Sequence, residues 1–297
     1  MARFNRREFV GSVVAGAAAT RLSPALGQTA PTGRPSPTDL VTLGRSGVKV
    51  SRLGLGTGVR GGMRTSNATR MGADKYLPIM RHAFEHGITF FDVADLYGTH
   101  GLLRQLVAEV GRDKVQIQSK VWFMDGGLPE KVTDAAGAVE RFLKEIGTDH
   151  LDSVLLHCTM DDHWTTRLEG MMAQLEDCKK RGLIRSHGTS CHSFGALRAA
   201  LDSPWVDVVQ ARINHRGPKM DGKPADIAAH CRALRDAGKG VIGMKIYGEG
   251  EIRNADERLA SMKYVLAEKC LDAMVIGMES IEHVDDSLAQ LRTALEA

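Results

Sequence analysis

The feature that most constrains the fold is a regular alternation of short apolar runs with longer amphipathic segments. Eight runs have the length and composition of buried β-strands, over residues 52–56, 88–91, 114–120, 151–156, 184–188, 206–211, 240–244 and 271–276. Each is followed by a segment that we expect to be helical, over residues 74–86, 102–110, 132–146, 167–181, 194–201, 225–237, 256–268 and 284–295. Eight strand–helix pairs in about 250 residues predict an α/β fold, the (β/α)8 TIM barrel.

An open, doubly wound sheet is the main alternative fold. A dinucleotide-binding sheet of that kind carries Gly-x-Gly-x-x-Gly directly after its first strand, where a helix begins. Residues 54–58 read Gly-Leu-Gly-Thr-Gly, which lacks this spacing and opens no helix at once. We therefore favour the barrel. Two short apolar runs around a glycine turn, at residues 40–50, predict a β-hairpin that caps the bottom of the barrel.

The N-terminus has the parts of an export signal. Arg6 and Arg7 precede a weakly apolar run over residues 10–19, and small residues follow at 25–27. An adjacent arginine pair followed by Phe9 resembles a twin-arginine (Tat) signal, although a disordered basic tail is the alternative. We expect residues 1–27 to be this signal, 28–39 a linker rich in Pro, Thr, Ser and Gly, and 40–297 the barrel. This organisation predicts export to the periplasm by the Tat machinery.

Charge and cysteine content exclude several classes of partner and site. The net charge is +3, but the first 27 residues hold four arginines against one glutamate, so the rest of the chain is neutral. We expect no nucleic-acid partner and no stable membrane span in the mature protein, because ten apolar or small residues are too few to cross a bilayer. Five cysteines without a Cys-x-x-Cys pair predict neither a disulfide framework nor a zinc site.

Polar side chains stand at the ends of three consecutive predicted strands. Asp92 ends the second strand, Lys120 the third and His157 the fourth, and Tyr97 follows in the loop after Asp92. The carboxyl ends of barrel strands carry the chemistry of such folds, so we expect these four side chains to meet at one mouth. Each also has an ordinary interpretation: a cap, a lysine reaching solvent, a core histidine and a packed loop tyrosine.

The four groups together are suited to protonating an oxygen while a hydride reaches the adjacent carbon. A phenol with its reference pKa of about 10 is a weak acid at neutral pH. We expect the Lys120 ammonium to lower the pKa of Tyr97. Asp92 would keep that buried ammonium charged, and His157 would hold a carbonyl oxygen by a hydrogen bond.

These residues resemble the motifs of the aldo-keto reductases, a family of NAD(P)-dependent oxidoreductases. Residues 91–98, Phe-Asp-Val-Ala-Asp-Leu-Tyr-Gly, resemble the strand-two motif of the family, and Lys120 and His157 fall where it places its lysine and histidine. The resemblance implies Tyr97 as general acid, Lys120 tuning it, Asp92 paired with Lys120, and His157 orienting the carbonyl. It also implies a nicotinamide cofactor across the barrel mouth, without a metal.

The same resemblance implies a set of cofactor-binding residues. They are Ser190, Cys191, Gln210, Met244, Lys245, Gly248, Gly277, Met278, Glu279, His283, Asp286 and Ser287. NADP(H) is the usual cofactor of the family. Glu279 would repel the 2′-phosphate, and His283 is the only base near it in the sequence, so NAD(H) is the alternative.

Some phrases resemble a subgroup with an iron–sulfur module, but the cysteine run that a cluster needs is missing, so we predict none. Trp122 and Trp164 follow the third and fourth strands and are candidate substrate-pocket residues; loop packing is the alternative interpretation.

Two functions remain open at this point. The first is an exported enzyme that reduces an aldehyde or ketone to the alcohol, or the reverse, with NAD(P)H. The second is a barrel that binds a dinucleotide without turnover, as a redox sensor or docking module. The complete set of Asp92, Tyr97, Lys120 and His157 favours the enzyme.

Overall fold

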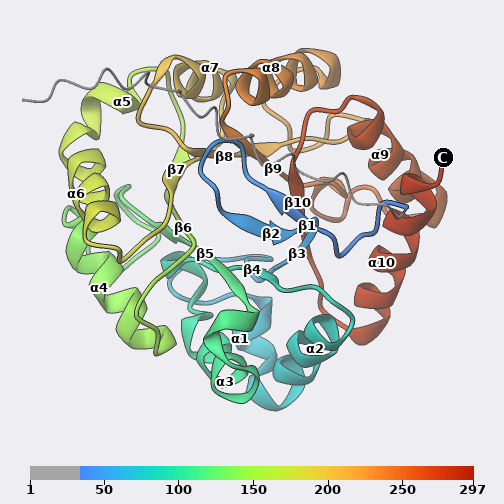
Figure 1. The fold of residues 1–297 in the computed structure, drawn as a ribbon, viewed down its shortest axis with the longest axis horizontal. Coiled ribbons are helices and arrows are strands. Elements are labelled where there is room, and N and C mark those ends of the chain that lie inside the picture. The colour runs from blue at the N-terminus through green and yellow to red at the C-terminus, as the bar shows by residue number, and fades with distance from the viewer. Residues whose placement is uncertain (1–33) are drawn as a thin grey trace, which may run out of the picture. The chain divides into compact units, whose positions relative to one another are not determined.

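The computed structural model of the protein describes residues 34–297 (Figure 1). The proposed signal, residues 1–27, and the linker up to residue 33 lie outside the described residues. Within the described part, one compact unit extends from Pro35 to Ala297. None of its helices combines the length and the apolar character that crossing a membrane requires.

Eight parallel strands close into a barrel, and the order around it is β10-β3-β4-β5-β6-β7-β8-β9. Their bounds are β3 Leu53–Gly56, β4 Phe90–Asp92, β5 Gln116–Val121, β6 Ser153–Thr159, β7 His187–Cys191, β8 Val208–Arg212, β9 Gly240–Met244 and β10 Ala273–Gly277. Neighbours in sequence are neighbours in the sheet, and β10 closes the ring by pairing with β3. The predicted (β/α)8 barrel is confirmed.

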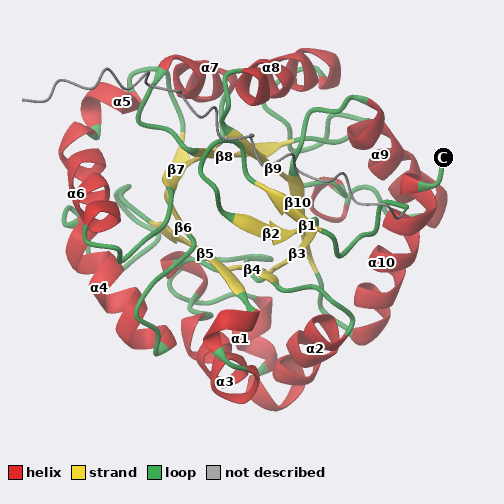
Figure 2. Cartoon of the chain, viewed as in Figure 1, coloured by secondary structure: helices red, strands yellow, loops and turns green. Residues whose placement is uncertain are grey.

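Helices surround this barrel on all sides, as Figure 2 shows. The ring consists of α2 Ala73–Glu85, α3 His100–Val110, α4 Ala135–Ile146, α6 Glu169–Lys180, α7 Phe194–Asp202, α8 Pro224–Asp236, α9 Ala255–Ala267 and α10 Ile281–Leu295. Two short helices, α1 Asn67–Met71 and α5 Trp164–Arg167, lie in the loops after β3 and β6. Each long helix packs an apolar stripe on the strands; in α4, Val139, Phe142 and Ile146 are fully buried.

The N-terminal hairpin closes one end of the barrel. Its strands, β1 Leu40–Thr42 and β2 Lys49–Ser51, pair antiparallel across the barrel axis (Figure 1). The hairpin side chains of Leu43, Val48 and Val50 are buried with Phe90 and Leu155 of the interior. Each such apolar side chain contributes about 1.5–3 kcal/mol when fully buried. The predicted hairpin cap is confirmed.

The contacts of Gly44 show which end of the barrel the hairpin closes. It forms a bridge with Lys239, which immediately precedes β9, so the hairpin lies at the N-terminal ends of the strands. A Cβ atom at Gly44 would stand 2.4 Å from the backbone nitrogen of Gly240, and its φ of +50° is also unfavourable for other residues. The C-terminal mouth of the barrel is left for the functional site.

Candidate active site at the C-terminal mouth of the barrel

The four side chains predicted for catalysis come from β4, β5, β6 and the turn after β4. Asp92 is the last residue of β4, Lys120 the last but one of β5, and His157 lies in the C-terminal half of β6. Tyr97 ends a short 3₁₀ helix, η1 (Asp95–Tyr97). Asp92, Lys120 and His157 are buried, whereas Tyr97 is partly accessible.

The structure brings these four side chains into one cluster. The Lys120 ammonium forms an ion pair with the Asp92 carboxylate and lies 3.2 Å from the carbonyl oxygen of Val93. It stands 5.1 Å from the centre of the Tyr97 ring. The Tyr97 hydroxyl in turn lies 3.3 Å from Nε2 of His157. A phenol, an ammonium, a carboxylate and an imidazole therefore share one end of the barrel.

Two glutamines complete the surroundings of the Asp92 carboxylate. Gln118 donates from Nε2 to Oδ1 of Asp92 at 2.7 Å, and Gln210 donates to Oδ2 at 3.3 Å. Asp92 thus accepts hydrogen bonds from three side chains, those of Gln118, Gln210 and Lys120. Sequence reasoning assigned Gln210 to the cofactor and missed Gln118, although Gln118 lies two residues before Lys120 on β5 and so faces the same side of the strand.

The pKa of Tyr97 differs from the prediction. Burial raises the pKa of its phenol well above 10, and the nearby Asp92 carboxylate raises it further. Burial also lowers the pKa of Lys120, although Asp92 opposes that shift. The expected lowering of the Tyr97 pKa is therefore wrong for the protein alone, because burial is the largest effect and the Asp92 charge acts in the same direction. At neutral pH, Tyr97 keeps its proton.

His157 is a neutral imidazole in this setting. Burial is the main cause of a pKa well below 6.5, and the Lys120 charge adds to it. Its Nδ1 is buried without a hydrogen-bond partner. Trp122 meets the imidazole edge-on, with ring centres 5.3 Å apart, and donates from Nε1 to the carbonyl of Gly126 at 2.6 Å. Trp122 therefore lies beside the cluster.

Trp164, the other tryptophan predicted for the substrate pocket, lies elsewhere. It is fully buried, and its Nε1 donates to the carbonyl oxygen of Ala196 at 3.2 Å. Its ring meets that of Trp205 edge-to-face, with centres 6.3 Å apart. That assignment is corrected: Trp164 is a core residue, because its helix α5 folds back onto α7.

A cavity of about 720 Å³ opens beside the cluster. Asp92 and Tyr97 form part of its wall, Gln210 of β8 another part, and the ends of β3, β9 and β10 with the segments that follow them form most of the rest. Eight of the twelve residues predicted to bind a cofactor line it: Gln210, Met244, Lys245, Gly277, Glu279, His283, Asp286 and Ser287. Its volume is typical of a site for a small molecule or cofactor.

The other four predicted cofactor residues do not line this cavity. Ser190 accepts from the backbone nitrogen of Cys158 at 2.9 Å. Cys191 is buried with its sulfur 3.7 Å from Oγ1 of Thr159. Met278 is fully buried, and Gly248 lies in the turn after β9. These positions shape the strand ends without reaching the cavity wall.

Two arginines that sequence reasoning did not select also line the cavity: Arg253 and Arg258, before and within α9. Arg258 pairs with Asp286 of α10 at 3.0 Å, while its Nε is buried without a partner. His283 is the only base near Glu279 in the sequence, but in the folded protein Arg253 and Arg258 line the same cavity. The packing of α9 against α10 brings these bases to the site, and no local motif signals it.

Comparison with known proteins agrees with this geometry. "Probable aldo-keto reductase 1" of Glycine max is 28% identical over 216 residues, which cover 71% of this chain and 60% of that protein. The "NADH-specific methylglyoxal reductase" of Escherichia coli is 25% identical over 193 residues, 59% of this chain and 58% of that protein. The chain therefore spans about three-fifths of the length of these curated relatives.

A solved structure and a family model extend the comparison. The aldo/keto reductase of Klebsiella pneumoniae in complex with NADP and acetate superposes with a TM-score of 0.64 at 21% identity, over 85% of this chain and 89% of that one. The model of the aldo/keto reductase family matches residues 52–263, well over half of the sequence. The chain belongs to the aldo/keto reductase family.

Proposed function

We propose that the protein reduces an aldehyde or ketone to the alcohol, or catalyses the reverse reaction, with NAD(P)H as hydride donor. The observation that carries this proposal is the pairing of the Tyr97 hydroxyl with Nε2 of His157, 3.3 Å apart, since Tyr97 lines the cavity. A carbonyl oxygen placed beside both groups would accept a hydrogen bond from each. Family membership supports the same reaction class.

In this proposal Tyr97 is the general acid. Its phenol keeps its proton at neutral pH, so it can donate to the oxygen as negative charge develops there. Lys120 stands within reach to stabilise the phenolate that results, and Asp92 balances the lysine charge. Neutral His157 orients the carbonyl oxygen without competing as an acid. The nicotinamide supplies the hydride when bound.

Two features of the cavity fit a nicotinamide dinucleotide. Gln210 lines the wall next to Asp92 with its Oε1 buried and unpaired, so it can accept from a carboxamide. Lys245, Arg253 and Arg258 supply positive charge for phosphates. We favour NADP(H), as in the Klebsiella protein's complex; NAD(H), which the Escherichia coli relative is named for, is the alternative because Glu279 lines the same wall.

The direct test measures oxidation of NADPH and NADH against a panel of aldehydes and ketones, with Tyr97→Phe as the control. We expect turnover in the native enzyme and a loss of at least about 100-fold in kcat for Tyr97→Phe, because general acid catalysis contributes at least this much. Equal turnover by Tyr97→Phe would reject the assigned acid. Tight dinucleotide binding without any turnover would favour the sensor or docking barrel.

We also propose that residues 1–27 direct export through the Tat machinery to the periplasm. Arg6, Arg7 and the apolar run that follows support this proposal. Fractionation of cells that express the full chain tests it. We expect the protein in the periplasm, and in the cytoplasm when Arg6 and Arg7 are both replaced by lysine. Unchanged location of that variant would reject a twin-arginine signal.

A further inference from the structure

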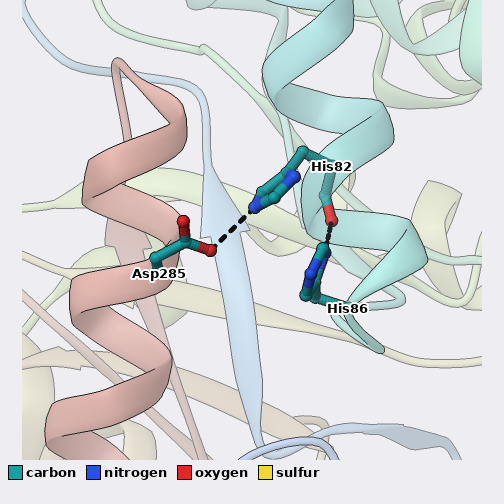
Figure 3. A group of neighbouring side chains, drawn as sticks. All are labelled: His82, His86 and Asp285. Carbon is teal, nitrogen blue, oxygen red and sulfur yellow. Dashed lines mark hydrogen bonds and ion pairs between the residues drawn. The ribbon is translucent and has the colours of Figure 1, made fainter.

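Two histidines and an aspartate meet in the outer layer of helices, where α2 packs against α10 (Figure 3). His82 lies in the last turn of α2, His86 is the C-cap residue of the same helix, and Asp285 lies in the second turn of α10. One donor atom from each side chain lies within 4.8 Å of the other two. Among residues 34–297, this is the one group of three such side chains with that spacing.

The second imidazole distinguishes this cluster from an ordinary ion pair. Nε2 of His82 lies 2.7 Å from Oδ1 of Asp285, which alone would be an imidazole–carboxylate contact. His86 follows one turn later on the same face, and the two ring centres are 4.0 Å apart. Two imidazoles four residues apart on a helix, with a carboxylate from a neighbouring element, are a donor set that Zn²⁺ and related divalent ions prefer.

The hydrogen bonding of His86 prepares it to act as a ligand. Its Nδ1 lies 2.8 Å from the carbonyl oxygen of His82 (Figure 3). A carbonyl only accepts, so Nδ1 carries the hydrogen and Nε2 carries a free lone pair. Metal-binding histidines commonly have this arrangement, in which one ring nitrogen donates to a carbonyl and the other binds the ion.

The side chains of the cluster are exposed enough to move into the positions that metal binding requires. The side chains of His82 and Asp285 are 21% and 55% exposed. Metal–ligand bonds of about 2.0–2.2 Å place tetrahedral donor atoms about 3.3 Å apart, so His82 and Asp285 would separate slightly and His86 would move closer. Side chains with this freedom can make such shifts, and water can complete the coordination shell.

We propose that His82, His86 and Asp285 bind one borderline divalent transition-metal ion, such as Zn²⁺, which joins α2 to α10. The site takes no part in the proposed reduction and does not depend on it. It departs from the sequence-based expectation of a protein without a metal. Because Asp286 and Ser287, the next residues of α10, line the cavity, the ion would hold a helix that forms one of its walls.

Titration of the chelator-treated full chain with Zn²⁺ tests the proposal by calorimetry, and Co²⁺ provides a visible absorption signal for nitrogen and oxygen ligands. We expect one equivalent bound with micromolar affinity. At a hundredfold excess of Zn²⁺ over its dissociation constant, the melting temperature should rise by about 5–10 °C. Absence of binding, or absence of any shift in melting temperature, would overturn the proposal.

Three variants locate the ion. His86→Ala and Asp285→Asn change exposed side chains, and each should weaken Zn²⁺ binding at least about tenfold and remove most of the thermal shift. His150→Ala is the matched control, because Nδ1 of His150 also lies 2.7 Å from a carboxylate oxygen, that of Asp149, without a second imidazole. Unchanged binding in His86→Ala, or loss in His150→Ala alone, would place the ion elsewhere and reject the site.

Discussion

At the scale of single residues, the Asp92 carboxylate is the centre of the cluster that we propose to be catalytic. It is buried, and it accepts from Lys120, Gln118 and Gln210. A buried carboxylate with three donors is held in one orientation, and it holds the Lys120 ammonium in turn. Gln118 does not line the cavity, so in the proposed reaction it would act only through Asp92, as a positioning residue.

Replacing Gln118 by leucine should therefore lower kcat without weakening cofactor binding. The change removes a hydrogen bond to a charged group, which is worth about 1.5–3 kcal/mol, or about tenfold or more in rate. We expect kcat to fall about tenfold while KM for the dinucleotide changes less than about twofold, as measured by steady-state kinetics.

Gln116→Leu is the matched control for this prediction. Gln116 lies two residues earlier on β5 and accepts from Oγ1 of Thr89 at 2.6 Å, without a contact to Asp92. Its replacement should leave kcat within about twofold of the native value. If both glutamine variants lose the same activity, the effect comes from the packing of β5 and not from the orientation of Asp92.

The sequence could predict which side chains meet at the mouth where a polar side chain ends a strand. Asp92, Lys120 and His157 could be selected because parallel strands bring their carboxyl ends together. The same reasoning misplaced Trp164, because a tryptophan near a strand end can turn into the core as readily as into the mouth. It also misjudged the pKa of Tyr97, because the degree of burial is not visible in a sequence.

At the scale of elements, the loop between β3 and α1 determines where the Tyr97 ring lies. A Cβ atom at Gly58 would stand 2.3 Å from Cζ of Tyr97, and one at Gly61 would stand 2.5 Å from Cδ1. The loop backbone therefore lies against the ring, and only glycine leaves the space that the phenol occupies.

Gly58→Ala should displace the phenol and lower kcat by about 100-fold, because small errors in the position of a catalytic group are costly. Gly62→Ala, in the same loop, is the control: a Cβ atom there meets nothing within 4 Å, so activity should stay near the native value. Kinetics and melting curves of both variants separate displacement from unfolding. Native activity in Gly58→Ala would show that the loop moves to make room for the methyl group and does not determine the position of Tyr97.

The packing of α9 against α10 brings Arg258 to the far end of the cavity. It pairs with Asp286 there, and its guanidinium lies 5.7 Å from the ring centre of Tyr247. This contact joins segments that no local sequence pattern connects, which is why sequence reasoning did not select Arg258. If Arg258 binds a 2′-phosphate, it should discriminate between the two dinucleotides.

Arg258→Gln should raise KM for NADPH about tenfold and change KM for NADH less than about twofold, because a charge-assisted contact to phosphate would be lost. Arg292→Gln, at an exposed arginine of α10, should change neither constant. Steady-state kinetics with both cofactors provide the measurement. Equal effects on the two cofactors would mean that Arg258 supports the wall of the cavity and does not select the phosphate.

At the scale of the whole molecule, the barrel was the most predictable feature. Eight strand–helix pairs and a preceding hairpin are repeated, local patterns, and the closed order of the strands follows from them. Strand ends were less certain: the eighth strand was expected at 271–276 and is Ala273–Gly277. The charge states of buried groups could not be predicted, because they depend on the packing of the complete fold.

Those buried groups should make the stability of the barrel depend on pH. Burial, aided by the charge of Arg212, lowers the pKa of His192 from 6.5 to about 3. Below pH 6.5 the unfolded chain therefore binds a proton at this residue that the native protein does not bind, so stability falls as pH falls. The loss grows by about 1.4 kcal/mol per pH unit until the folded pKa is reached.

Between pH 6.5 and pH 4.5, His192 alone should therefore cost about 2–3 kcal/mol in the free energy of unfolding. The pKa of His157 and of His187 is also lowered mainly by burial, so the total loss in the native protein should be larger. His192→Gln cannot take up the proton and should reduce the fall by that amount, whereas His163→Gln, at an exposed histidine, should not. Urea unfolding at several pH values measures these free energies. If the free energy of unfolding falls equally with pH in the native protein and in His192→Gln, His192 is solvated and charged in the folded state.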